Sequence, residues 1–194
     1  MHSTLQPTGD TSWTALAPEA KRDRLLAAAE RVFAEGGLDA PMPAIAREAG
    51  ASVGSVYRQF SSKDELVAAL AERRLATLQA ALDEALGKGD AWAGLRSFVW
   101  RALGDDGSDD VAAQAIASTS TFKPVRKARK RVHARLEELL ERAKAQGAVR
   151  SDATRIDITV TIVGARAVRH VHPDAWRRMV ELMLDGLRAR PRKR

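Results

Sequence analysis

The sequence predicts an all-α protein in which an N-terminal three-helix domain is followed by a larger helical domain. Alanine and leucine, which favour helix, are abundant, and aromatic residues make up only 5% of the 194 residues. Apolar residues recur three or four positions apart along most of the chain, which is the spacing of one helix face. Glycines follow several of these segments, where a helix end favours a residue that tolerates positive φ.

The first helix is predicted over residues 18–35. Its apolar stripe includes Leu25 and Phe33, and the pair Gly36 and Gly37 ends it. Residues 1–17 have no helical period and contain Gly, Pro, Thr and Ser, so we expect a disordered arm there. The chain shows no secretory signal and no apolar stretch long enough to span a bilayer, so we expect a soluble cytoplasmic protein that does not enter a membrane.

Residues 44–63, AIAREAGASVGSVYRQFSSK, predict two short helices joined by a tight turn. Each helix has two apolar residues four positions apart, which are Ile45 with Ala49 and Val56 with Phe60. Gly50 lies between the helices, where the chain needs a residue that tolerates positive φ. This spacing indicates a helix-turn-helix, and two packed helices of an ordinary helical domain are the alternative.

The second short helix has a polar face. Ser52 is a good N-cap, and Gly54 would let the backbone approach a phosphate closely. Ser55, Arg58 and Gln59 stand at i, i+3 and i+4, away from the apolar stripe. Hydroxyl, guanidinium and amide groups are what base edges and phosphates require, and a short amphipathic helix fits a major groove.

The next helix is predicted over residues 63–86 and begins with a capping box. Ser62 is the cap, and Glu65 is expected to reach back to the amide of Ser62. Lys63 is then the first helical residue, where it could hold a phosphate. The carboxylates of Asp64 and Glu65 would repel a phosphate, but they also favour the helix start by themselves. We interpret this long helix as the link between the two domains.

The net charge of +7 gives little support to DNA binding by the first domain. Between residues 19 and 74, nine Lys and Arg oppose nine Asp and Glu, so the basic excess lies elsewhere. The densest positive charge is in residues 123–135, which could be a second DNA contact or the mouth of a pocket for an anionic ligand. A solvated face balanced by Glu137, Glu138 and Glu141 is the interpretation we favour.

Residues 24–70 resemble the N-terminal domain of the TetR family of bacterial transcriptional regulators. The pattern is a helix followed by GG, then IA, AG, S-x-G-S-x-Y-x-x-F and SKDEL. The resemblance implies a homodimer that binds a palindromic operator in double-stranded DNA, usually represses, and releases DNA when a small molecule enters the C-terminal domain. The family usually has Thr where Pro41 stands and Val where Ala51 stands, so a phosphate-contacting hydroxyl is missing at the first position.

The resemblance also implies DNA-contact roles for particular residues. Tyr57 and Lys63 would touch phosphate, and Ser55 and Arg58 would approach bases. Combined with the polar face, it gives the following DNA-binding candidates: Arg47, Ser52, Gly54, Ser55, Tyr57, Arg58, Gln59 and Lys63. Residues 18–68 are therefore expected to form a helix-turn-helix DNA-binding domain.

Residues 69–188 are expected to form a helical ligand-binding and dimerisation domain, followed by a basic tail over 189–194. Further helices are predicted over 92–103, 111–119, 124–146, 156–168 and 175–187. The turn G-x-x-R-x-D at 147–152 again resembles the family. The last two helices carry apolar stripes that can complete a four-helix bundle with a second subunit, or form an intramolecular core in one chain.

The ligand candidates are the large apolar side chains of the second domain, for which plain core packing is the alternative: Trp92, Phe98, Trp100, Phe122 and Met179. No cofactor or metal is expected, since the chain has no cysteine, His170 and His172 stand two apart and so point to different faces of a helix, and the acidic run 105–110 lacks calcium-loop spacing. No catalytic motif is present, so we do not expect an enzyme. Two hypotheses for the function remain: a ligand-responsive repressor, and a helical protein-interaction module without ligand sensing.

Overall fold

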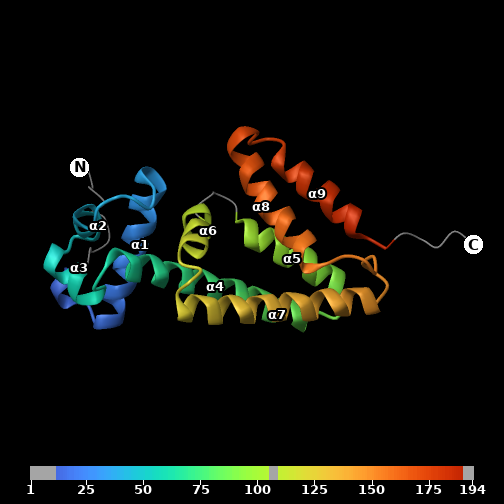
Figure 1. The fold of residues 1–194 in the computed structure, drawn as a ribbon, viewed down its shortest axis with the longest axis horizontal. Helices are drawn as coiled ribbons and strands as arrows, with labels where there is room; N and C mark the ends of the chain where they lie inside the picture. Colours follow the sequence, from blue (N-terminus) through green and yellow to red (C-terminus); the bar gives the residue numbers. More distant parts are fainter. Residues whose placement is uncertain (1–11, 105–108, 190–194) are drawn as a thin grey trace, which may run out of the picture. The chain divides into compact units, whose positions relative to one another are not determined.

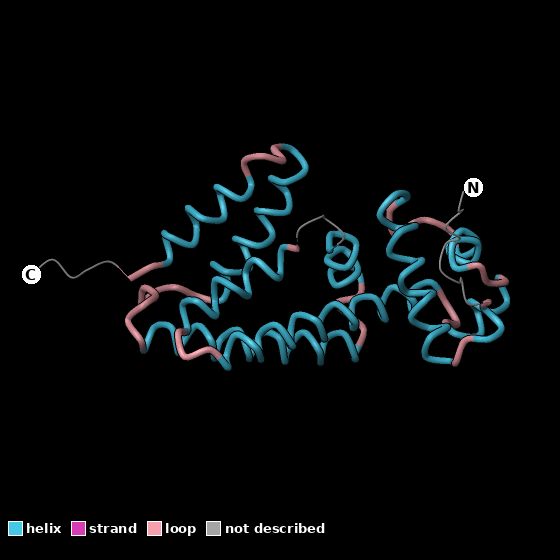
Figure 2. The backbone as a smooth tube through the Cα atoms, turned by 180° about the vertical axis from the view of Figure 1, so that it is seen from behind, coloured by secondary structure: helices cyan, strands magenta, loops and turns pink. Residues whose placement is uncertain are grey.

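Helices make up all the regular secondary structure that the computed structural model describes, which covers residues 12–104 and 109–189 (Figures 1 and 2). The predicted all-α class is confirmed. The chain divides between Leu66 and Val67 into two compact units. None of the described helices is both long and apolar enough to cross a membrane.

The first unit contains three complete helices and the start of a fourth. These are α1 (Pro18–Gly36), α2 (Met42–Ala49), α3 (Val53–Gln59) and the first turn of α4 (Lys63–Gly87). Their facing sides are apolar, and the largest fully buried side chains of the core are Leu25, Phe33, Ile45, Phe60 and Leu66. Most of the predicted arm and of the predicted basic tail lies outside the described residues, but Trp13–Ala15 form a short 3₁₀ helix within the arm.

The turn between α2 and α3 depends on Gly50. Its φ is 66°, in the left-handed region, and its amide donates to the carbonyls of Ala46 and Arg47 at the end of α2. A Cβ at this position would lie 3.3 Å from Nη2 of Arg24. Both the backbone conformation and the available space therefore favour glycine, as the sequence predicted.

Two arginines of α1 satisfy the free carbonyls at the ends of α2 and α3. Nε of Arg24 donates to the Ala49 carbonyl at 2.8 Å, and Nη1 of Arg22 donates to the Gln59 carbonyl at 3.5 Å. The Arg22 guanidinium also lies 4.4 Å from the centroid of the Phe60 ring. A cation at a helix C-terminus offsets the helix dipole and supplies donors to carbonyls that lack helical partners. The first helix thus fixes both helices of the pair.

The second unit contains the rest of α4 and five further helices. These are α5 (Ala91–Leu103), α6 (Asp109–Ser118), α7 (Lys123–Ala145), α8 (Arg155–Val171) and α9 (Trp176–Leu187). Helices α8 and α9 run side by side, and α5 packs against α7 and α8 (Figures 1 and 2). Helices α4 and α5 approach closely at Gly94, where a Cβ would lie 2.6 Å from the Ala85 carbonyl oxygen.

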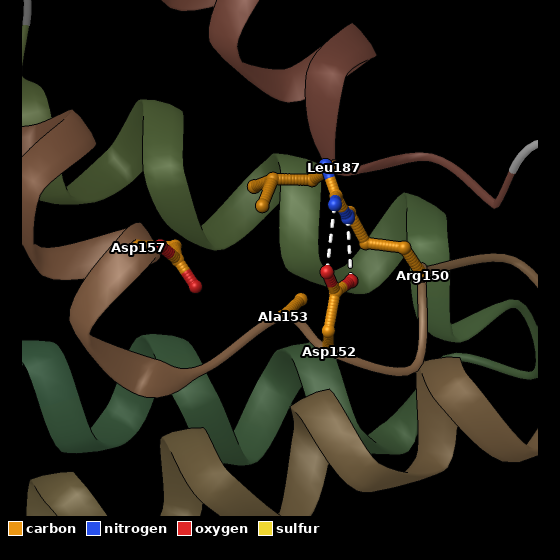
Figure 3. Close-up of a pocket in the computed structure, with 5 residues that line it drawn as sticks. All are labelled: Arg150, Asp152, Ala153, Asp157 and Leu187. Carbon is orange, nitrogen blue, oxygen red and sulfur yellow. Dashed lines mark hydrogen bonds and ion pairs between the residues drawn. The ribbon is translucent and has the colours of Figure 1, made fainter.

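The predicted G-x-x-R-x-D turn connects α7 to α8 and lies beside Leu187 at the end of α9 (Figure 3). The Arg150 guanidinium donates two hydrogen bonds to the Asp152 carboxylate, at 2.5 and 2.7 Å. The backbone amide of Arg150 donates to the Leu187 carbonyl at 3.0 Å. The hydrogen bonds from Arg150 lower the pKa of Asp152. The charges of Arg150 and Asp152 thus neutralise each other, and we assign the turn a structural role.

Candidate nucleic-acid interface and ligand cavity

A chain of hydrogen bonds runs along the start of α3. The hydroxyl of Ser52 accepts from the backbone amide of Ser55 at 3.1 Å, as expected of an N-cap. The two serine hydroxyls are 2.9 Å apart, and Nη2 of Arg58 donates to the hydroxyl of Ser55 at 2.8 Å. The N-cap Ser52 and the guanidinium of Arg58 therefore belong to one hydrogen-bond network, joined through Ser55.

Ser55, one of the predicted DNA-binding residues, is largely buried in the structure. Ser55 is only 8% exposed, because its hydroxyl lies between Ser52 and Arg58. Tyr57, at 49% exposed, and Arg58 face solvent, while Gln59 is half-buried. The exposed polar groups of α3 are thus the guanidinium and the phenol, and Ser55 supports the former.

The first two residues of α3, Val53 and Gly54, are exposed. Apart from its neighbours in the chain and the backbone of its own helix, the nearest heavy atom to a Cβ built on Gly54 would be Nη1 of Arg58, 4.0 Å away, so the described fold leaves room for a side chain there. Val53, the first residue of the helix, is also exposed, although it is not among the predicted DNA-binding residues. Its spacing of three from Val56 and seven from Phe60 would place it on the apolar stripe, so the sequence carries no signal of its exposure.

The start of α4 differs in detail from the predicted capping box. The Glu65 amide donates to the hydroxyl of Ser62 at 3.1 Å, as predicted. The Glu65 carboxylate accepts from the amide and the hydroxyl of Ser61, both at 2.7 Å, instead of from the Ser62 amide. The bonds from Ser61 lower the pKa of Glu65. Lys63 is half-buried at this helix start, and Arg47 is exposed on α2.

A hollow of about 210 Å³ lies beside the polar side of α3. Its lining combines Ser55, Arg58 and Gln59 of α3 with Lys21 and Pro18 of α1 and with Trp13. Trp13 falls in the predicted arm, and sequence spacing alone could not place it here, because it lies far along the chain from α3. The structure thus adds Trp13 and Lys21 to the surroundings of the predicted DNA-binding residues.

The second unit has a cavity of about 350 Å³. Residues from α4, α5, α6, α7 and α8 line it, and of the predicted ligand residues it includes Phe98 but not Trp92, Trp100, Phe122 or Met179. Trp100 instead packs against Trp176 with ring centroids 5.9 Å apart, and Trp92 lies under the Arg188 guanidinium. The structure therefore does not bring the five predicted residues together in one pocket.

Helices α8 and α9 expose apolar side chains. Ile156, Val160 and Val163 follow one another at helical spacing on α8, and each is more than half exposed. Val171 at the end of α8 and Leu182 on α9 are exposed to the same degree. Such exposed apolar side chains on two packed helices are candidates for a surface that another molecule covers.

Both parts of the chain match families of known proteins. Residues 25–70 match the model described as bacterial regulatory proteins of the tetR family, and residues 89–189 match the C-terminal domain of SbtR-like transcriptional regulators. Together they cover most of both units.

Solved structures of whole regulators are similar along nearly their full length. A TetR transcriptional regulator from Streptomyces coelicolor is 31% identical, with a TM-score of 0.66 over 88% of this chain and 99% of that one. A TetR regulatory protein from Mycobacterium vanbaalenii is 30% identical, with a TM-score of 0.63 over 86% of this chain and 94% of that one. A fatty acid degradation regulator from Bacillus halodurans, at 20% identity and a TM-score of 0.69 over 88% and 97%, shares the fold. The chain belongs to the TetR family of bacterial transcriptional regulators and is a DNA-binding protein of that family.

Proposed function

We propose that this protein is a repressor that binds a palindromic operator as a homodimer and is released by a small molecule bound in the cavity of its second unit. The observation that carries the DNA part is the exposed side of α3, where Arg58 is held by Ser55 and Tyr57 stands beside it. The remaining parts rest on the exposed face of α8 and α9 and on the cavity.

The side chains on α3 divide into reading and positioning roles. Arg58 reads a base edge in the major groove, since a guanidinium can donate two hydrogen bonds to guanine. Ser55 holds Arg58 in place, so its contribution to base reading is indirect. Gly54 lets a phosphate approach the first turn, and Val53 offers an apolar contact to a thymine methyl group.

Phosphate contacts fix the protein on the duplex. Tyr57 donates its hydroxyl to a phosphate, and Lys63 supplies a positive charge at the N-terminus of α4, where backbone amides also favour an anion. Arg47 and Gln59 complete the contact surface from the end of α2 and the end of α3. Lys21 lies in the hollow beside α3 and adds a further cation next to the DNA backbone.

The dimer forms through α8 and α9. Pairing the exposed apolar faces of two copies would remove Ile156, Val160 and Leu182 from water, which favours association. A two-fold dimer presents two α3 helices to successive major grooves, roughly 34 to 36 Å apart, and so reads a palindrome in the bacterial cytoplasm.

The effector acts through α4. This helix begins at Lys63 in the first unit, and Leu75 and Leu78 farther along it line the cavity of the second. A ligand that fits the cavity better when α4 is shifted favours the shifted state and lowers operator affinity. A ligand that binds both states equally leaves operator affinity unchanged.

Two conservative substitutions test the DNA-binding surface. Tyr57→Phe removes one hydroxyl and Lys63→Gln removes one charge, and each is expected to weaken binding to DNA upstream of the gene roughly ten- to a hundredfold at fixed salt. Lys63→Gln should also reduce the slope of log affinity against log salt by about one, because one phosphate is no longer neutralised. Lys130→Gln on α7 is the matched control and should leave affinity and slope unchanged. If Tyr57→Phe and Lys63→Gln both bound DNA with wild-type affinity, this surface would not be the one that binds DNA.

A further inference from the structure

The cavity of the second unit has an apolar part and a cationic part. Apolar side chains come from every helix around it, among them Leu75, Phe98, Ile116, Leu136 and Ile162. The cationic part is built from α7 and α8. Arg129 and His133 stand one turn apart on α7, and Arg155 and Arg166 stand on α8. Within the part of the chain that the structure describes, no Asp or Glu lines this cavity.

The four cationic side chains differ in how far groups of the protein already bind them. Arg166 donates to the Ala102 carbonyl at 2.7 Å and lies 3.8 Å from the Asp110 carboxylate, so its guanidinium already serves the fold. The carboxylate nearest Arg155 is that of Glu137 on α7, at 4.0 Å, the limit of an ion pair. Among the described residues, Arg129 makes no ion pair with an acidic side chain.

The pKa of His133 reflects the positive charges in the cationic part of the cavity. Its pKa is lowered by burial first, then by the positive charges of Arg155 and Arg129. The imidazole is therefore neutral at neutral pH and has one N–H to donate. Two half-buried guanidinium groups beside a neutral imidazole, with no acidic side chain in the described wall, form a site that an anion would stabilise.

We propose that the effector is a small amphipathic carboxylate whose head binds Arg129, His133 and Arg155 and whose apolar body lies among Phe98, Leu136 and Ile162. This inference rests on the proposed ligand-released function and names the chemical class of the ligand. A cavity of about 350 Å³ is of the size that holds small organic ligands, and its lining separates into the two parts that such a molecule requires. The basic stretch on α7 thus supplies the cation that closes one end of a pocket.

Pairs of compounds that differ only in charge test this inference. Octanoate and octanamide, and hydrocinnamate and its primary amide, share an apolar body within each pair, and inorganic phosphate supplies an anion without one. Calorimetric titration of the full-length protein is expected to show at least about tenfold tighter binding of each carboxylate than of its amide, and no binding of phosphate. Equal affinity within both pairs, absence of carboxylate binding, or phosphate binding as tight as that of the carboxylates would overturn the proposal.

Substitutions in the wall locate the head group. Arg129→Gln and Arg155→Gln are each expected to weaken carboxylate binding roughly ten- to a hundredfold and to leave amide binding nearly unchanged. Arg131→Gln removes a charge from an exposed position on α7, two residues from Arg129, and should change the affinity for neither the carboxylate nor the amide. Loss of carboxylate binding in Arg131→Gln as well would show a general charge effect and contradict the assigned site.

The titration of His133 gives a readout that does not depend on DNA. A carboxylate beside the imidazole offsets the charges of Arg129 and Arg155, so the pKa of His133, followed by NMR with His133→Asn for assignment, should rise with octanoate and stay in place with octanamide. An unchanged His133 pKa at saturating octanoate would place the carboxylate elsewhere and overturn the site.

Operator release separates this inference from the function it rests on. If octanoate binds at Arg129 and Arg155 but leaves operator affinity unchanged, the carboxylate site stands and the proposed release fails. If neutral amides release the operator as well as carboxylates do, release stands and the carboxylate class is wrong.

Discussion

Arg58 shows how the role of a side chain depends on its neighbours. The residue types on α3 predict three DNA-contacting groups, and in the structure Arg58 donates to the hydroxyl of the buried Ser55. A guanidinium already bonded to a hydroxyl has fewer orientations to lose when it meets a base, so less binding free energy is spent on ordering it. The spacing i, i+3 cannot reveal this, because it fixes which side chains are neighbours but not which of them is buried.

Gly54 gives opposite predictions for stability and for DNA affinity. Gly54→Ala should stabilise the folded protein by about 0.5–1 kcal/mol, because glycine in a helix costs conformational entropy and the structure leaves room for a Cβ. In the proposed complex the same methyl group faces a phosphate, so operator affinity should fall roughly tenfold. Thermal unfolding and DNA titration of the same preparation measure the two effects.

Gly87→Ala is the control for this variant. Gly87 also lies in open space, at the end of α4, and its substitution should leave operator affinity unchanged. A Gly54→Ala protein that binds the operator as tightly as the wild type would show that DNA does not approach the first turn of α3.

At the scale of the element, the sequence predicts the helices well because their ends are marked locally. Gly50 ends α2 and Ser52 caps the start of α3, as expected. The helix predicted over 156–168 was three residues too short at its C-terminus, since α8 continues to Val171. His172, which precedes a proline and so avoids the helical region, ends it.

Features that depend on contacts between distant segments could not be predicted in the same way. Trp100 was grouped with the ligand residues because it is large and apolar, but its ring packs against Trp176, seventy-six positions away. The cationic corner of the cavity combines Arg129 with Arg155 from another helix. Neither pairing leaves a periodic signal in the sequence.

The start of α4 should respond to acid through Glu65. Hydrogen bonds from Ser61 hold the pKa of this carboxyl below its ordinary value, so its ionised form stabilises the fold above its unfolded pKa. That contribution is lost as pH falls through the folded pKa. Glu65→Gln should therefore lower thermal stability at neutral pH. It should also make thermal stability fall less steeply as the pH is lowered from neutral to about 3.

Asp64→Asn is the matched control, because it removes a neighbouring charge that does not bond Ser61. Thermal unfolding of the wild type and both variants across this pH range measures the difference. An equal flattening in both variants would assign the effect to general charge near the helix start.

At the scale of the whole molecule, the proposed dimerisation through α8 and α9 is tested by substitutions that lie outside the proposed DNA-binding surface. Val160→Asp and Leu182→Asp each place a charge on the exposed apolar faces and should give monomers in sedimentation, with weaker operator binding because two half-sites are no longer joined. Phe122→Asp, an equivalent change at an exposed residue before α7, should remain dimeric. A dimer that persists in both interface variants would move the subunit contact elsewhere.

The DNA-reading claim is tested most directly by selecting bound fragments from random duplex DNA with the full-length protein. Two α3 helices on a two-fold dimer predict an enriched palindrome whose half-site centres lie about one helical turn, roughly 10 base pairs, apart or a multiple of it. Tyr57→Phe and Lys63→Gln should bind that palindrome more weakly than the wild type. Enrichment of no common sequence, or of one without two-fold symmetry, would contradict a homodimer that reads an operator through α3.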